Sequence, residues 1–368
     1  MEHGDMRRHH LSLVLEALLA DGASSRAALA QRVGLTKATM STLVADLLGR
    51  GLVTEGSARR DGQVGRPGVI VEPRGTSLGA LGLEIRVDEV AACLVDLTGS
   101  VRFSSRRRVD NERSRPTTVA NRLVAVAEEV LGEAAGADVR CVGGAVAVPG
   151  LVDPDTRALV AAPNLSWPEV LLSRVDDRLG LSLAIENEAN LAALAELRHG
   201  AGTDLRSFVS VTAGGGVGGG VVLERTLVRG HHGFAAEIGH LVVDPGGPAC
   251  SCGARGCLEA VIGRDGDAPT DVVVDALASA LRSITHLVDP QAVVLGGTLA
   301  DLGDGDVADL ETALVERTLG GRWHPTQVRR SPLGRDAALI GGATLTLDRL
   351  ITDPTILPPL DSTKEPMS

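Results

Sequence analysis

The sequence is poor in aromatic residues and in long apolar runs. Its 368 residues include no tyrosine, two tryptophans and three phenylalanines, so the core must be built from the Leu, Val, Ile and Ala that dominate the 44% hydrophobic share. No apolar run approaches the roughly 20 residues needed to span a bilayer. The N-terminus also lacks the charged-then-apolar pattern of a secretory signal. We therefore expect a cytoplasmic protein of two or three domains, with no membrane segment.

The net charge of −11 is unevenly distributed along the chain. Residues 1–74 contain ten basic and eight acidic residues, which makes this segment +2 and the remainder −13. A mildly basic segment attached to an acidic body is typical of a DNA-binding module joined to another domain.

Cysteines are few, yet three of the five lie within eight positions, downstream of a histidine. An odd number of cysteines without a secretory signal favours a reducing compartment, where such a cluster is more often a metal site than a disulfide. One histidine and three cysteines complete a tetrahedral shell, which predicts a closed, structural Zn²⁺ site: His240, Cys250, Cys252 and Cys257. The alternative is a disulfide with incidental neighbours. Glu237 and Glu259 bracket the cluster. The segment 237–259 therefore predicts a pocket in which the metal site fixes the position of the chain that carries these two acids.

Residues 1–74 carry the pattern of a winged helix-turn-helix domain. Apolar residues from Leu11 to Leu19 recur at helical spacing and predict a first helix that ends near Asp21. Either Ser24 or Ser25 can cap a second helix, and Thr36 can cap a third that runs to about Leu48.

The predicted third helix exposes small or hydrogen-bonding side chains, which suit base edges and phosphates in a major groove: Thr36, Lys37, Ala38, Thr39, Ser41 and Thr42. Two short strands with a basic, glycine-rich connection follow and predict a wing. Arg59, Arg60 and Arg66 in that connection are expected to reach phosphates or the minor groove. The alternative is a plain three-helix unit with a solvated basic hairpin.

Further along, predicted strands and helices alternate, which indicates an α/β body. A glycine run at 214–220 follows a strand predicted at 209–212. Such a run either binds phosphate through its backbone or lets a strand and a helix pack closely.

Residues from about 80 to 350 resemble the ROK family of repressors and sugar kinases. The matching motifs occur in the family's order, and the most specific is Glu-x-Gly-His followed by Cys-x-Cys-Gly-x-x-Gly-Cys-Leu-Glu: 149–153, 162–167, 186–190, 214–220, 236–240, 250–259 and 341–343. The resemblance implies two actin-like (ribonuclease H-like) α/β domains with a sugar cleft between them. A winged helix ahead of this body is similar to the repressor branch. We expect three segments: a head at 1–74, a body at 75–350 and a disordered, proline-rich tail at 351–368.

The resemblance also implies roles for individual residues. His240, Cys250, Cys252 and Cys257 match the family's zinc ligands. The implied sugar-binding set consists of polar side chains that can engage neighbouring hydroxyls, which are costly to leave unpaired in a buried pocket: Asn164, Asn187, Glu188, Glu237, His240 and Glu259.

Three departures argue against kinase activity. The kinases' phosphate turn, Asp-x-Gly-Gly-Thr, reads Glu-Ile-Arg-Val-Asp at 84–88, so both glycines are missing. Glu188 stands where the catalytic aspartate is expected, and Gly215 stands where kinases carry threonine. Because phosphoryl transfer depends on positioning, we predict that the protein is not an enzyme.

The resulting expectation is a sugar-responsive transcriptional repressor. It would bind operator DNA as a homodimer or homotetramer and take a pentose or hexose as effector; the Asn-Glu-Ala-Asn stretch is similar to that of xylose-responsive repressors. Two alternatives are a ROK sugar kinase with an accessory DNA-binding head, and a regulator whose body only dimerises. The segment after Glu259 is shorter than in the family, so oligomer packing is expected to differ.

Overall fold

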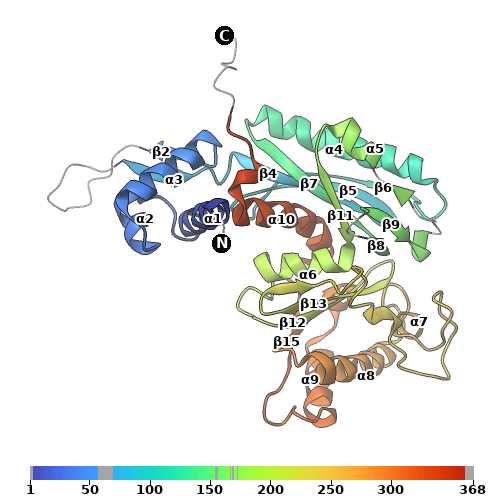
Figure 1. Cartoon of the computed structure of the whole chain (residues 1–368). Helices are drawn as coiled ribbons and strands as arrows, with labels where there is room; N and C mark the ends of the chain where they lie inside the picture. Colours follow the sequence, from blue (N-terminus) through green and yellow to red (C-terminus); the bar gives the residue numbers. More distant parts are fainter. Residues whose placement is uncertain are drawn as a thin grey trace.

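The computed structural model of the chain describes residues 3–56, 69–153, 156–165, 167, 170–171 and 173–360. A helical head lies beside the upper of two α/β lobes, and the second lobe lies below the first (Figure 1). The mixed α/β class predicted from the sequence is confirmed.

The head consists of three helices and a small three-stranded sheet of order β1-β3-β2. Its elements are α1 (His3–Asp21), β1 (Ser24–Ser25), α2 (Arg26–Arg32), α3 (Lys37–Gly49), β2 (Val53–Gly56) and β3 (Ile70–Pro73). Short polar side chains cap the N-termini of α2 and α3. Ser25 accepts a hydrogen bond from the Ala28 N–H and Thr36 accepts one from the Thr39 N–H, each at 3.2 Å. The wing strands β2 and β3 pair antiparallel, whereas the connection at 57–68 lies outside the described residues.

The upper lobe is built on a five-stranded sheet of order β11-β7-β4-β5-β6. Its strands are β4 (Leu78–Ile85), β5 (Glu89–Asp96), β6 (Val101–Arg108), β7 (Arg140–Val148) and β11 (Leu183–Asn187). The helices α4 (Pro116–Gly136) and α5 (Ser173–Leu179) cover one face, and α10 (Ala337–Thr352) covers the other. A second small sheet contains β8 (Leu151–Asp153), β9 (Ala158–Ala161) and β10 (Val170–Leu171).

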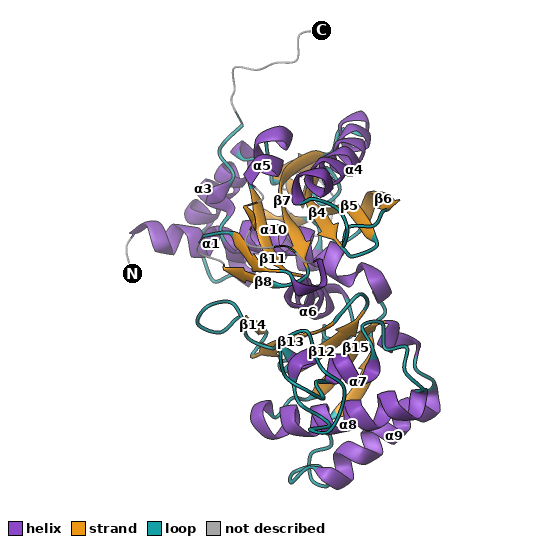
Figure 2. Cartoon of the chain, turned by 90° about the vertical axis from the view of Figure 1, so that its right-hand side faces the viewer, coloured by secondary structure: helices purple, strands orange, loops and turns teal. Residues whose placement is uncertain are grey.

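The lower lobe repeats this plan with a sheet of order β14-β13-β12-β15-β16. Its strands are β12 (Phe208–Ala213), β13 (Val217–Leu223), β14 (Thr226–Val228), β15 (Ala292–Gly297) and β16 (Gln327–Arg330). The helices α7 (Leu258–Ile262), α8 (Thr270–Val288) and α9 (Asp304–Arg317) lie on its outer side. The helix α6 (Glu188–His199) lies between the lobes and packs against both (Figure 2).

Glycines allow the central elements to approach one another closely. A Cβ on Gly218 would lie 2.7 Å from the Ala189 Cβ, and one on Gly220 would lie 2.5 Å from the Ala193 Cβ. These two glycines belong to β13 and face α6, so this half of the run at 214–220 serves close packing. Only residues 214–216 form the turn between β12 and β13.

The head shares one hydrophobic core with the body. Leu11 and Leu15 of α1 belong to the same buried cluster as Leu347 and Leu350 of α10. Burial of this apolar surface stabilises the joint because the hydrophobic contribution grows with the area removed from water. The head is therefore fixed to the end of α10 in this conformation, not merely tethered by a linker.

The residues after α10 correct the prediction of a disordered tail from residue 351. A short 3₁₀ helix, Pro354–Ile356, follows α10, and Leu357 is buried. Arg50 of the head donates hydrogen bonds to the carbonyls of Thr355 and Leu357, and the Leu360 N–H donates to Gly49. The proline-rich composition suggested disorder, but contacts with the head hold residues 351–360 in place. Residues 361–368 lie outside the described part.

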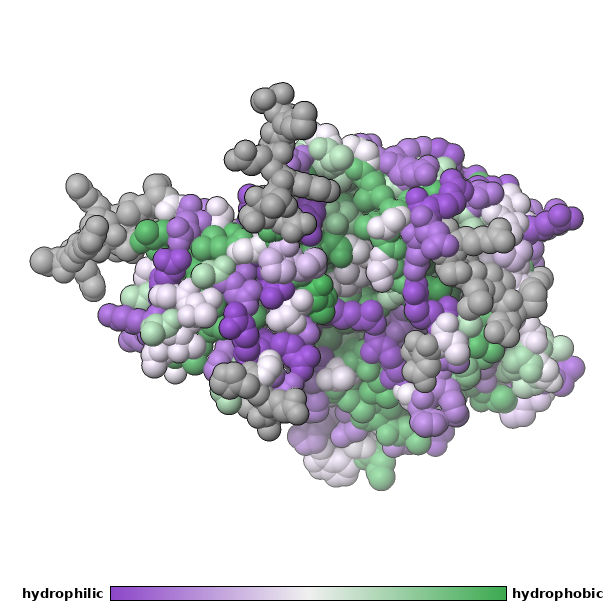
Figure 3. Space-filling view, turned by 45° about the horizontal axis from the view of Figure 1, so that its top comes forward, coloured by the Kyte–Doolittle hydropathy of each residue, from purple (hydrophilic) through white to green (hydrophobic). Residues whose placement is uncertain are grey.

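No helix in the described part of the chain is long and apolar enough to cross a membrane. Hydrophilic and hydrophobic residues are interspersed over the face of the molecule seen in Figure 3.

Candidate functional site: a zinc-type cluster, a cavity between the lobes and an exposed recognition helix

The N-terminal half of α3 lies exposed on the surface of the head. Thr36, Lys37, Ala38, Ser41 and Thr42 are exposed, and Thr39 is half-buried. The opposite face of the helix is buried in the head: Met40, Leu43, Val44 and Leu47. The hydroxyls of Ser41 and Thr42 donate hydrogen bonds to the carbonyls of Lys37 and Ala38. Among these residues Lys37 carries the one formal positive charge. Arg59, Arg60 and Arg66 lie outside the described residues.

The predicted cluster of one histidine and three cysteines is brought together. The ligand atoms of His240, Cys250, Cys252 and Cys257 all lie within 4.8 Å of one another. The Sγ atoms of Cys252 and Cys257 are 3.6 Å apart, and Cys250 Sγ is 3.5 Å from His240 Nδ1. Tetrahedral zinc with bonds of about 2.0–2.3 Å has ligand-to-ligand edges of about 3.3–3.8 Å, so the donor set and these two spacings fit such an ion. All five cysteines are free, so the disulfide alternative is not realised.

Local structure explains why these residues converge. His240 ends the 3₁₀ helix Ile238–His240, and Cys257 is the residue before α7. An isolated β-bridge joins Val242 to Cys257, and the Leu258 N–H donates to the Leu241 carbonyl at 2.8 Å. The two short helices are therefore held side by side, each carrying one of the bracketing acids at its start.

A cavity of about 220 Å³ opens next to this cluster, between the two lobes. The upper lobe contributes Gly150 and Asn164, and α6 contributes its first residues. The lower lobe contributes residues 216–219 and residues of the segment 237–259. The cavity contains every residue of the predicted sugar-binding set: Asn164, Asn187, Glu188, Glu237, His240 and Glu259.

Several polar side chains around this cavity are hydrogen-bonded to the protein, and they still have donors or acceptors available for a ligand. Glu259 is 8% exposed, and its Oε2 accepts from the Val217 N–H at 2.9 Å. Asn187 caps α6 through its Oδ1, while its Nδ2 donates to the Gly150 carbonyl at 3.0 Å. Glu237 is exposed. Since His240 turns Nδ1 toward Cys250, its Nε2 is the nitrogen left for a ligand.

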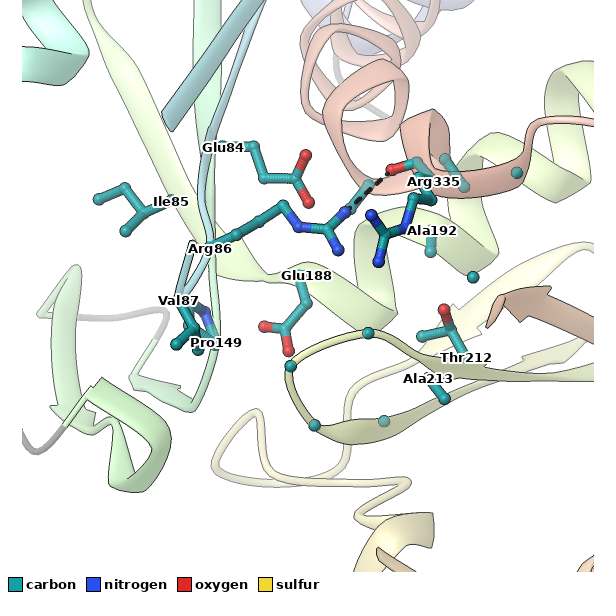
Figure 4. A pocket seen from close by; sticks show the side chains of 18 residues that line it. Glu84, Ile85, Arg86, Val87, Pro149, Glu188, Ala192, Thr212, Ala213 and Arg335 are labelled. Atoms are coloured by element: carbon teal, nitrogen blue, oxygen red, sulfur yellow. Dashed lines mark hydrogen bonds between the residues drawn. The ribbon is translucent and has the colours of Figure 1, made fainter. Parts of the chain in front are cut away.

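A smaller cavity of about 50 Å³ adjoins the first and shares Pro149 and Glu188 with it. Figure 4 shows the Arg86 side chain extending from the end of β4 between Glu84 and Glu188 toward Arg335, whose carbonyl accepts from Arg86 at 3.5 Å. Arg86 Nη2 also reaches the turn between β12 and β13, since a Cβ on Gly214 would lie 3.1 Å from it. The guanidinium therefore occupies the space in front of the glycine turn.

Two acids line this smaller cavity: Glu84 is buried, and Glu188 is half-buried. Burial raises the pKa of Glu188 to about 8, and the nearby Glu84 and Glu237 contribute in the same direction. Burial also raises the pKa of Glu84 to about 7, despite the guanidinium of Arg86. One oxygen of each carboxyl has no partner in the described structure. Glu188 therefore favours its neutral form at pH 7, whereas Glu84, with a pKa of about 7, is divided between its neutral and charged forms there.

We expect Glu188→Gln to change how stability depends on pH. The raised pKa means that the unfolded chain loses the Glu188 proton near pH 4.5, while the folded protein keeps it to about pH 8. The free energy of unfolding of the wild type therefore falls as pH rises through this window. Glutamine cannot ionise, so the variant should gain stability relative to the wild type between pH 5 and pH 8. Urea unfolding at both pH values measures this difference, with Glu316→Gln as an exposed control; parallel curves would contradict the assignment.

Sequence reasoning did not identify the roles of Arg86, Glu84 and Arg335. The missing glycines at 86–87 were visible, but the direction of the Arg86 side chain depends on how the lobes meet. Ser251, between two cluster cysteines, also lines the larger cavity and was missed. Its position within Cys-Ser-Cys was the available signal.

Comparisons with known proteins agree with this architecture. The ROK family model matches residues 80–268, just over half of the chain, and the MarR family model matches residues 12–63. The protein therefore belongs to the ROK family, and it carries a MarR-type winged helix at its N-terminus.

Individual relatives include both repressors and kinases. A xylose repressor of Bacillus subtilis (strain 168) is 25% identical and aligns over 94% of this chain and 97% of its own. A glucokinase of Streptomyces coelicolor is 30% identical, over 72% of this chain and 96% of its own. Among solved structures, a ROK family transcriptional regulator homologous to the E. coli MLC protein has a TM-score of 0.79. It is 22% identical and covers 95% of this chain and 97% of its own.

Proposed function

We propose that the protein is a transcriptional repressor that binds operator DNA through its head and a monosaccharide through the cavity between its lobes. The observation that carries this proposal is the combination of an exposed recognition helix with a cavity lined by Asn187, Glu237 and Glu259. A relative with the same full-length organisation is named a xylose repressor. A pentose or hexose is therefore the effector class.

The polar groups around the larger cavity suit neighbouring hydroxyls. Carboxylates accept hydrogen bonds only, so Glu237 and Glu259 each offer acceptors to vicinal hydroxyl groups. The Nδ2 of Asn187 and the Nε2 of His240 offer donors. A bound sugar would thus contact both lobes at once, which favours the closed arrangement over an open one.

The cluster residues would hold Zn²⁺ as a structural ion, which adds no chemistry but fixes the segment 237–259. His240 is a ligand and a cavity residue, so its orientation by the metal also orients its other nitrogen toward the sugar. The metal site and the sugar site would then share His240.

A route from cavity to head runs along α6 and α10. The first residues of α6 line the larger cavity, and α6 packs along α10. The start of α10 lines the smaller cavity at Ala337, and its last turns join the core of the head at Leu350, about 20 Å away at 1.5 Å per residue. Closure of the lobes on a sugar would move α10 and so reposition α3.

The kinase alternative is less well supported by the site. Backbone donors of the glycine turn are already used: the Gly215 N–H donates to Asp265 at 2.8 Å and the Gly214 N–H to the Gly216 carbonyl at 3.0 Å. Arg86 occupies the space in front of them. Glu188, with a pKa of about 8, is mostly protonated at pH 7 and is a poor general base.

Two measurements test the proposal. Selection of bound fragments from genomic DNA is expected to return a pseudo-palindromic sequence, because a symmetric oligomer reads two half-sites. Incubation with ATP and glucose or xylose is expected to yield no sugar phosphate. DNA binding without sequence preference, or phosphorylation that Glu188→Ala abolishes, would overturn the proposal.

A further inference from the structure

A third cavity, of about 420 Å³, lies beside β7, β11 and the last turns of α10. No residue lines both this cavity and the one assigned to the sugar. Apolar side chains form part of the wall, among them Val142 and Leu350, and the segment after α10 closes one side with Ile356 and Leu357.

Positive charge is concentrated in this cavity, although the chain as a whole carries −11. Three arginines line it, Arg157, Arg229 and Arg349, against one carboxylate, Glu186. Arg157 forms an ion pair at 2.6 Å with Asp176, a residue that does not line the cavity. It also donates a hydrogen bond to the Leu183 carbonyl. These two hydrogen bonds fix Arg157 as part of the wall.

The other two arginines share a single counter-ion. Arg229 Nε donates to Glu186 Oε2 at 2.6 Å. Arg349 has no carboxylate within 4.0 Å among the described residues, and Glu186 is the one acid that acts on it from further away. Arg349 is exposed overall, yet partial desolvation of its guanidinium lowers its pKa, and the positive charge of Arg229 adds to the effect. Two cations held together with one carboxylate would be stabilised by an added anion.

We propose that this cavity binds a small phosphorylated metabolite, with Arg229 and Arg349 holding the phosphate group. Guanidinium groups are planar and present paired N–H donors that match phosphate oxygens, which makes arginine better suited to this task than lysine. A water molecule occupies about 30 Å³ in the liquid, and a phosphate ion occupies the space of a few such molecules. The cavity of about 420 Å³ therefore has room for a ligand larger than phosphate alone. The apolar wall is placed to contact the carbon skeleton of the ligand.

The cavity lies at a junction between the sugar-binding element and the head. Glu186 Oε1 accepts from the Asn187 N–H at 3.2 Å and from Asn190 Nδ2 at 3.1 Å, and Asn187 lines the sugar cavity. On the other side, Leu357 accepts a hydrogen bond from Arg50 of the head. A phosphate that competes with Glu186 for Arg229 would therefore bind between the sugar-binding residue Asn187 and the head.

Isothermal titration calorimetry of the full-length protein at low ionic strength tests this assignment. The probes are inorganic phosphate, glycerol 3-phosphate and glycerol; none of them is a sugar, so the result does not depend on the proposed effector. We expect glycerol 3-phosphate to bind more tightly than inorganic phosphate, and glycerol not to bind. Equal affinity for the two phosphates would contradict a metabolite site, and no binding of either at millimolar concentration would overturn it.

Matched variants locate the binding. Arg349→Gln should weaken glycerol 3-phosphate binding by about tenfold or more, the loss expected for a charge-assisted hydrogen bond. Arg349→Lys keeps the charge but loses the paired donors, so a smaller loss is expected. Arg282→Gln, an exposed arginine on α8, is the control and should bind as the wild type does. If both Arg349 variants bind with wild-type affinity, the ligand does not occupy this cavity and the proposal fails.

Discussion

Replacing Cys252 with serine is expected to release the bound metal and to lower the free energy of unfolding by several kcal/mol. Metal-binding energy in such sites contributes directly to folding, and a folded domain typically has only about 5–15 kcal/mol in total. Cys252 is itself exposed, so little apolar packing is lost with its thiol. Metal analysis of the purified variant and urea unfolding measure the two effects.

The matched control for this variant is Cys141→Ser. Cys141 is a half-buried cysteine outside the cluster, with its thiol near the Gly143 carbonyl, which a hydroxyl can also bond. It should keep about one zinc per chain and nearly all of its stability. Cys252→Ser protein that remains as stable as the wild type, or wild-type protein that contains no metal, would refute a structural zinc site.

Substituting Glu259 with glutamine is expected to weaken monosaccharide binding about 10- to 100-fold. Hydrogen bonds to a charged group contribute about 1.5–3 kcal/mol, and each 1.4 kcal/mol corresponds to a factor of ten. Glutamine has nearly the same shape and keeps one carbonyl oxygen for the Val217 N–H. The loss therefore reports on the charge and acceptor that face the cavity. Calorimetric titration with the effector found in a sugar screen measures it.

A control at a distant acid distinguishes a site effect from a general charge effect. Glu316→Gln changes an exposed glutamate of α9 by the same one atom and should bind sugar as the wild type does. An unchanged affinity in Glu259→Gln would show that the sugar lies elsewhere. A loss in both variants would point to the net charge of the protein instead of this side chain.

Much of the head was predictable because its signals are local. Helix spacing around Leu11, Leu15 and Leu18, and caps such as Ser25 and Thr36, act within a few residues. The cluster cysteines were equally visible, since their spacing and chemistry indicate a metal without any knowledge of the fold. The exposed face of α3 was predicted from the small and polar side chains of its N-terminal half, and Met40 on the opposite face is buried.

What could not be predicted depends on contacts between distant segments. The reach of Arg86 to Gly214, the shared core of α1 and α10, and the ordering of the chain after α10 all arise from tertiary packing. Gly218 and Gly220 illustrate the ambiguity of a local signal: a glycine run suggests a phosphate turn or close packing, and only the position of α6 decides between them for these two residues.

Operator binding measured with and without sugar tests the central claim most directly. With the operator found by selection, a saturating effector sugar should lower the affinity of the wild type by about 5- to 150-fold, the usual range of allosteric coupling. Glu259→Gln should bind the operator as the wild type does, but should not respond to the same sugar concentration. Equal operator affinity in the two conditions, with sugar demonstrably bound to the wild type, would contradict a sugar-responsive repressor.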